Sequence, residues 1–180
     1  MFKQLPDKMP GSEKDTVAKI RLGRKLYNEQ KISINGTQSC NSCHRLDNFG
    51  VDGEPTSEGH RKQRGGRNSP TVHNAALHVS QFWDGRAADV EEQAKGPVLN
   101  PIEMAMPSEA AVVAVLESIP GYAPLFAAAF PGDPKPIRYD NMAAAIGAFE
   151  RGLITPAPFD RFLAGEDAAL GPDARRGLSL

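Results

Sequence analysis

Apolar residues recur at helical spacing in several segments of the chain. Side chains that return every three or four residues share one face of a helix. No segment shows the alternation of apolar and polar residues that is typical of a half-buried strand. The pattern predicts an all-α protein with helices over Thr16–Asn28, Ala87–Lys95, Ser108–Ile119, Tyr122–Phe130 and Asp140–Leu153.

Polar and turn-forming residues predict where these helices begin and end. Ser108 and Asp140 are expected as N-caps, and Gly96-Pro97 is expected to end the helix over Ala87–Lys95. The side chains expected to be buried are Val112, Val113, Val115, Leu116 and Ile119 in one helix and Met142, Ile146, Phe149 and Leu153 in another.

Between the helices, Asp47–Pro70 consists almost entirely of glycine, charged and turn-forming residues. The chain as a whole contains 17 Gly and 15 Pro, which favours long loops. Such a segment has few apolar anchors, so it is either disordered or packed over a cofactor or partner. The expected fold is a c-type cytochrome-like helical domain with long loops wrapped around one covalently bound haem.

The last part of the sequence predicts a domain boundary. A short helix is expected at Phe159–Ala164, and another begins after Gly171-Pro172 and reaches the end without a stop signal. We therefore expect a first domain over residues 1–164 and the start of a truncated second domain over residues 165–180. Met1–Pro6 lacks an apolar core, so the sequence is expected to be a mature form without a signal peptide.

Charge and apolar run length exclude two classes of partner. The net charge is −1 and the sequence pI is about 6.4, which gives no basic field for nucleic acid. The longest apolar runs, Ala110–Leu116 and Leu125–Phe130, are far shorter than the roughly 20 residues of a membrane span. We expect neither nucleic-acid binding nor a membrane span.

Cys40-Asn41-Ser42-Cys43-His44 contains both cysteines of the chain. A C-x-x-C-H sequence is typical of c-type haem attachment: the thiols bond to the haem periphery and the histidine binds the iron. A zinc site would need further Cys or His ligands at matching spacing. A thioredoxin-like pair would need a βαβ context, so covalent haem is the prediction.

The second axial position of the haem has several candidates, and the sequence leaves them open. They are His60, His73, His78, Met104, Met106 and Met142. His60 lies on a glycine-flanked loop with few apolar anchors, and such a loop can move at little cost. A removable ligand is typical of a haem that performs chemistry, whereas two permanent ligands are typical of electron transfer.

The segment from Gln93 to Met104 offers polar groups for chemistry at a haem. Glu103 is flanked by Ile102 and Met104, so partial desolvation would favour proton exchange near neutral pH. A surface carboxylate is the plainer interpretation of Glu103. Trp83, the only tryptophan, is either a core aromatic or part of an electron path between redox centres.

Ordered motifs along the chain resemble those of bacterial di-haem cytochrome c peroxidases. They are Cys40–His44, Arg67-Asn68-Ser69-Pro70-Thr71, Phe82-Trp83-Asp84-Gly85-Arg86-Ala87, Gln93-Ala94-Lys95-Gly96-Pro97 and Asn100-Pro101-Ile102-Glu103-Met104. The resemblance implies that His44 is the proximal ligand of the peroxidatic haem and His60 its displaceable distal ligand. It also implies that Glu103 is the catalytic acid–base, with Gln93 as its partner in the distal pocket. Trp83 would lie between the two haems, and Asn68 would bind a calcium ion.

The resemblance further implies a periplasmic enzyme that reduces hydrogen peroxide with electrons from a small cytochrome c or cupredoxin. The family has a second C-x-x-C-H in a C-terminal haem domain, and only its lead-in, Ala168–Leu180, is present here. A homodimer is compatible with the sequence. Two alternatives stay open: an electron-transfer cytochrome with two permanent ligands, and the related methylamine-utilisation di-haem class, which oxidises a partner protein. His60 argues against the latter.

Overall fold

The structure is a computed structural model that describes residues 2–180. Within this range there is no β-strand, only isolated bridges between Glu58 and Arg64 and between Gln81 and Ala87. The α-helices are α1 (Val17–Tyr27), α2 (Cys40–Cys43), α3 (Val90–Leu99), α4 (Glu109–Ser118), α5 (Tyr122–Ala129), α6 (Tyr139–Glu150), α7 (Pro158–Leu163) and α8 (Pro172–Leu178). The prediction of an all-α fold is confirmed.

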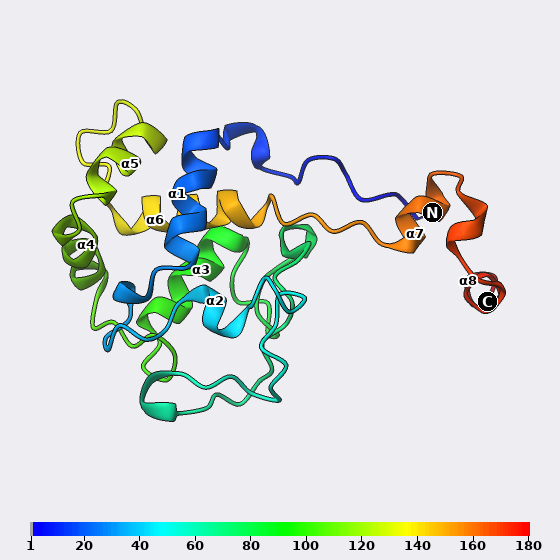
Figure 1. The fold of residues 1–180 in the computed structure, drawn as a ribbon, viewed down its shortest axis with the longest axis horizontal. Helices are drawn as coiled ribbons and strands as arrows, with labels where there is room; N and C mark the ends of the chain where they lie inside the picture. The colour runs from blue at the N-terminus through cyan, green and yellow to red at the C-terminus, as the bar shows by residue number, and fades with distance from the viewer. Residues whose placement is uncertain (1) are drawn as a thin grey trace.

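The body of the molecule is built around α6, against which α1 and α3 pack (Figure 1). Leu22 and Leu26 of α1 are fully buried, and so are Met142 and Ile146 of α6. Gly23 allows α1 to approach α6 closely, because a Cβ atom at this position would collide with the Ala145 carbonyl group. This apolar contact makes a rigid scaffold for the loops on the other side of the body.

The ends of α1, α4 and α5 lie within one or two residues of their predicted positions, and Ser108 caps α4 as expected by accepting a hydrogen bond from the Ala111 amide. The prediction for α3 was wrong at both ends. Asp89 caps the helix, which then continues through Gly96 and Pro97 to Leu99. Proline lies within the last two turns, and burial of the following Val98 in the apolar core outweighs the lost backbone bond.

The prediction that Asp140 caps α6 was wrong. Asp140 lies in the first turn of this helix, where its carboxylate pairs with Lys95 Nζ at 2.9 Å. Val112 and Leu116 of α4 are buried as expected, whereas the other three predicted core residues, Val113, Val115 and Ile119, are only partly buried. The helix is peripheral, so only one narrow stripe reaches the core.

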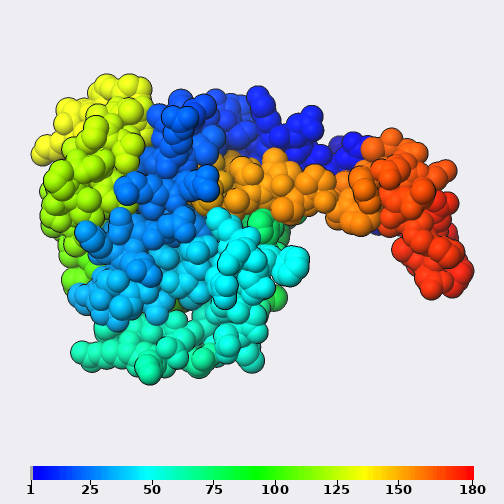
Figure 2. Space-filling model, viewed as in Figure 1, coloured from blue at the N-terminus to red at the C-terminus, as the bar shows by residue number. Residues whose placement is uncertain are grey.

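The two ends of the chain run side by side away from the body and form an arm that also carries α7 and α8 (Figures 1 and 2). The Leu5 amide donates to Asp160 Oδ1 at 2.9 Å, and the rings of Phe2 and Phe159 pack edge to face. The division into domains over 1–164 and 165–180 stays a prediction, and Met1 lies outside the described residues.

Helix length and composition bear on the expected absence of a membrane span. Within residues 2–180, no single helix is long and apolar enough to cross a membrane. Only α4 and α5 taken together meet that test, as a pair bent by 112°.

Candidate haem site

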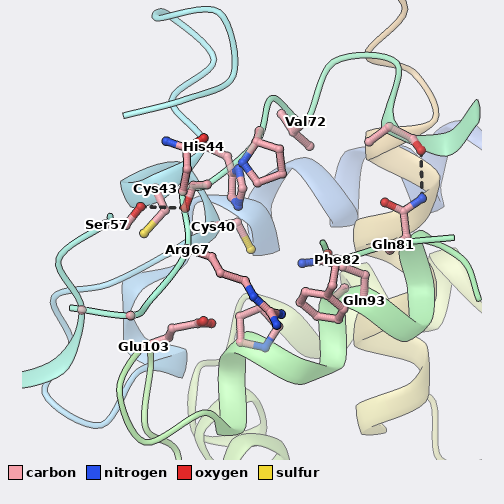
Figure 3. A pocket seen from close by; sticks show the side chains of 18 of the residues that line it. Cys40, Cys43, His44, Ser57, Arg67, Val72, Gln81, Phe82, Gln93 and Glu103 are labelled. Carbon is pink, nitrogen blue, oxygen red and sulfur yellow. Dashed lines mark hydrogen bonds between the residues drawn. The ribbon is translucent and has the colours of Figure 1, made fainter. Parts of the chain in front are cut away.

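The C-x-x-C-H motif forms the single turn of α2 and the residue after it. The Ser39 amide donates to Ser42 Oγ at 3.0 Å, and the His44 amide donates to the Cys40 carbonyl oxygen at 3.0 Å. This turn places Cys40, Cys43 and His44 in the wall of one cavity, with both sulfur atoms on the cavity side (Figure 3).

Two hydrogen bonds hold His44 in place. Its Nδ1 lies 2.9 Å from the Pro70 carbonyl oxygen, and the buried Tyr27 hydroxyl donates to the His44 carbonyl oxygen at 2.6 Å. A carbonyl oxygen can only accept, so Nδ1 carries the proton and Nε2 keeps its lone pair. Burial lowers the pKa of His44, which also favours the neutral ring that binds a metal.

The two cysteines are free thiols, and burial raises the pKa of both. Within the described residues, no group of three or more Cys, His, Asp or Glu side chains could hold a metal ion. The donor set therefore fits haem and does not fit zinc.

The rest of the cavity wall also fits haem, which has an apolar body and a carboxylate edge. The apolar part of the wall comprises Val72, Ala75, Phe82, Ala94, Pro97, Ile102 and Met104. Two arginines of the wall, Arg67 and Arg86, share Asp84 as a partner, at 2.7 and 2.8 Å. Together the three side chains carry one net positive charge, which favours an anionic group on that side of the cavity.

Glu103 and Gln93 lie in the same cavity wall (Figure 3). Glu103 is partly buried, and burial raises the pKa of its carboxyl group, while the nearby Arg86 and a hydrogen bond from Asn100 act in the opposite direction. Asn100 Nδ2 donates to Glu103 Oε1 at 3.1 Å, and Asn100 Oδ1 accepts from the Ile102 amide at 3.0 Å. Glu103 is therefore a partly desolvated carboxyl group held beside the haem-binding residues, not a surface carboxylate.

The loop that carries His60 is attached to the segment that carries Glu103. The His60 amide donates to the carbonyl oxygens of Ile102 and Glu103, each at 2.8 Å. Gly59 lines the cavity, and a Cβ atom there would collide with the Ile102 carbonyl group. The His60 ring does not line the cavity, and its Nδ1 atom is buried without a hydrogen-bond partner.

Among the other axial candidates, Met104 lines the cavity, whereas His73, His78, Met106 and Met142 do not. Met106 and Met142 lie in the apolar core. The assignment of His60 as the displaceable ligand stays a prediction.

Trp83 contributes to the cavity wall and is 64% exposed, so it is not a core aromatic. Its Nε1 donates to the Asn68 carbonyl oxygen at 2.8 Å, and the Asn68 side chain donates to the Glu54 carbonyl oxygen at 2.8 Å. Trp83 belongs to the turn between Gln81 and Ala87, which is closed by the Gln81 amide donating to the Ala87 carbonyl oxygen. The backbone of this turn is strained at Phe82, whose φ is +64°.

Sequence analysis did not identify Arg67, Arg86, Asn100 and Glu150 as members of the site, although all but Asn100 line the cavity and Asn100 contacts Glu103. Glu150 did leave a signal: it is a carboxylate that directly follows the uncharged, mostly apolar run 142–149. Arg67, Arg86 and Asn100 belong to the motifs that resemble the family, but the motifs assigned them no role, because that role depends on which distant residues they meet.

The family model described as di-haem cytochrome c peroxidase matches residues 17–168. The chain is 44% identical to a cytochrome c551 peroxidase from Pseudomonas aeruginosa over 181 residues, which is 99% of this chain and 52% of that protein. It is 39% identical to methylamine utilization protein MauG from Methylorubrum extorquens over 166 residues, covering 92% of this chain and 46% of the relative. The chain thus spans about half the length of the relatives it matches.

A solved structure gives the same relationship. A crystal structure of a MauG-like protein associated with microbial copper homeostasis superimposes with a TM-score of 0.84 and 32% sequence identity, over 98% of this chain and 52% of that one. Since the family model covers most of the chain and the C-x-x-C-H motif lies within the match, this chain belongs to the di-haem cytochrome c peroxidase family, which implies haem c.

Proposed function

We propose that this chain is the peroxidatic haem domain of an enzyme that reduces hydrogen peroxide to water with electrons from a small cytochrome c or cupredoxin. The observation that carries the proposal is the partly buried Glu103 carboxyl group in the same cavity as Cys40, Cys43 and His44. A partly desolvated carboxyl group with a raised pKa beside a haem is a stronger base than an exposed carboxylate and is suited to exchange protons. The name of the Pseudomonas aeruginosa relative supports the same reaction.

In this proposal Cys40, Cys43 and His44 would hold the haem, which would pass on to peroxide the two electrons that its reduction requires and that the donor protein provides. The Glu103 carboxylate accepts a proton from one peroxide oxygen and returns it to the other as the O–O bond breaks. Gln93, in the same wall, orients the peroxide through its amide group. One further pair of protons from solvent completes two water molecules.

Replacement of Glu103 by glutamine tests the assignment. Glu103→Gln keeps the shape of the side chain and its acceptor for Asn100 but removes the proton-accepting oxygen. Turnover of peroxide is expected to fall by about 10²–10⁴-fold while the haem absorption spectrum stays unchanged. Steady-state kinetics of the haem-loaded protein measure the fall, and Glu117→Gln, the same change at an exposed position of α4, is the control. A near-normal rate for Glu103→Gln would remove this residue from the mechanism.

Several finer assignments belong to the same proposal. His44 is the proximal ligand and His60 the displaceable distal ligand, Trp83 is on the electron path, and Asn68 binds calcium. The protein works in the periplasm with a second haem domain, and a homodimer is compatible with this scheme. The orphaned Nδ1 atom of His60 and the contact of its backbone with Glu103 support a loop whose position is linked to the site.

A second candidate function is oxidation of a partner protein. It is favoured by the 39% identity to a protein named MauG and by the 64% exposure of Trp83, which would place an aromatic side chain within reach of a partner. An electron-transfer cytochrome is a third. Rapid turnover of peroxide with a reduced donor protein would favour the peroxidase, whereas a haem that does not react with peroxide at all would leave electron transfer.

A further inference from the structure

One buried carboxyl group of the cavity wall has no part in the proposed reaction. Glu150, the last residue of α6, lines the cavity and is only 6% exposed. Among residues 2–180, no hydrogen bond or ion pair reaches its carboxyl group, although a buried carboxylate normally requires both.

The neighbouring arginine does not neutralise Glu150, because its charge is already used. The guanidinium group of Arg151 donates to Asp15 at 2.5 and 2.8 Å and also to Glu91. Two carboxylates against one guanidinium leave a net negative charge beside Glu150. An ionised Glu150 would add a second negative charge to this buried cluster, which is unfavourable in a medium of low dielectric constant.

The groups that face Glu150 come from each helix packed around it. They are Tyr27 of α1, Cys40 of α2, Glu91 of α3 and Arg151 directly after α6. Among these four groups, only Arg151 favours the ionised form of Glu150. Burial, followed by the negative charge of Glu91, raises the pKa of Glu150 to about 8. Cys40 no longer titrates once it is bonded to haem, and burial keeps Tyr27 neutral.

We propose that Glu150 is a proton site coupled to the haem bound in this cavity, neutral while the iron is reduced and able to release its proton to solvent when the iron is oxidised. Reduction takes one electron from a donor protein or an electrode, and in alkaline solution one proton from water is taken up by the Glu150 carboxylate. A negative charge at Glu150 stabilises ferric over ferrous iron. By linkage, the reduction potential falls as the pH rises through the pKa of Glu150.

This inference rests on haem attachment but not on peroxide reduction. Peroxide turnover and the reduction potential are separate measurements on the same haem-loaded protein. Loss of turnover in Glu103→Gln without a change in the pH dependence of the potential would leave Glu150 in its role. A normal turnover together with a pH-independent potential would overturn the role of Glu150 and leave the peroxidase intact.

Spectroelectrochemical titration of the haem attached at Cys40 and Cys43 tests the proposal between about pH 6 and pH 10. In the wild type, the ratio of reduced to oxidised haem at a given electrode potential is expected to fall by up to about tenfold per pH unit in alkaline solution, which is about 59 mV for one electron. Glu150→Gln mimics the neutral acid. The ratio of reduced to oxidised haem in this variant should therefore match that of the wild type at low pH and should not fall at high pH. A Glu150→Gln curve that falls in parallel with the wild type would overturn the proposal.

Two further variants and a second readout separate this role from a structural one. Glu150→Asp keeps a carboxyl group and should restore the pH dependence, whereas Glu117→Gln should follow the wild type. The infrared spectrum at neutral pH should contain a protonated-carboxyl band that is absent in Glu150→Gln but present in Glu103→Gln. If that band survives in Glu150→Gln, the neutral acid is another residue and the proposal fails.

Discussion

The helical half of the molecule and the loop half, residues 44–89, are held together by different forces. Of the buried apolar residues in the main core, Val72 is the only one among residues 44–89 in the described chain. The loop half is held instead by single polar contacts, such as Thr71 Oγ1 donating to the Phe49 carbonyl oxygen at 2.6 Å and Ser57 Oγ lying 2.6 Å from Ser69 Oγ. The helices provide the apolar core, and the loop half contributes His44, Arg67 and Arg86 to the cavity wall.

The two halves also differ in backbone strain, which is concentrated in the loop half. Phe49, Arg61, Lys62, Asn74 and Phe82 all have positive φ angles although none is glycine. They lie in the loop half, and only Ala105 among the described residues shares this property elsewhere. Such conformations persist only when the surroundings hold them, so the loop half should depend on the haem more than the helices do.

The largest expected effect comes from removing the haem attachment. The double variant Cys40→Ala, Cys43→Ala should lose all covalently bound haem, which a haem stain of a denaturing gel measures. Hydrogen exchange should then show that residues 44–89 lose protection before α1 and α6 do, because only the helices keep their own apolar core. Equal loss of hydrogen-exchange protection in both halves would contradict the separation of the two regions. As controls, the single variants Cys40→Ala and Cys43→Ala should each retain one thioether bond to haem.

The second-largest effect, a loss of stability, is expected at the contact between α1 and α6. Gly23→Ala should lower the free energy of unfolding by about 1–3 kcal/mol or more, because the new methyl group meets the Ala145 carbonyl group and both helices must move apart. Chemical denaturation measures the change. Gly121→Ala is the matched control: no atom lies within 4 Å of the added methyl group and the φ angle of −70° suits alanine. Similar losses in the two variants would show that this helix contact is not special.

A smaller effect is expected where the two halves meet at Glu103. Asn100→Asp keeps the acceptor for the Ile102 amide but replaces the donor to Glu103 with a negative charge, which raises the pKa of Glu103. If Glu103 acts as the base, the acid side of the pH–rate profile should move to higher pH. At pH values below the shifted side, the rate of peroxide turnover should fall by about tenfold or more. Asn28→Asp, at an exposed position, should leave the profile unchanged. An unmoved acid side would show that Asn100 only shapes the turn.

The smallest effect is expected at the exposed ion pairs of the loop half. Arg67 and Arg86 hold the pKa of Asp84 well below its usual range. A lowered pKa in the folded state stabilises the fold above the pKa of the unfolded state, and this stabilisation is lost as the pH falls. Asp84→Asn should therefore be slightly less stable than the wild type at neutral pH and low salt, and the difference should vanish in acid or high salt. Thermal unfolding at several pH values and salt concentrations measures it.

Much of the helical half could be predicted from the sequence, because apolar spacing and caps are local signals. The Ser108 cap and the burial of Met142, Ile146 and Phe149 in α6 are examples, whereas Leu153, expected on the same face, lies after the end of α6 and is only partly buried. The passage of α3 through Gly96-Pro97 could not be predicted, since it depends on the burial of Val98 by distant residues. The surroundings of Trp83 were also undetermined, because its hydrogen bond to Asn68 joins two loops that local patterns do not connect.

For the site, the sequence by itself predicted the haem attachment, because the spacing of Cys40, Cys43 and His44 within one turn suits the covalent geometry of the haem. It also placed Glu103 and Gln93 near one another in the chain. Only the tertiary structure decided that Glu103 and Glu150 both face the cavity, since α3 and α6 must pack before their burial is known. A pKa depends on burial and on neighbouring charges, so the chemistry of these two carboxyl groups arises only in the folded protein.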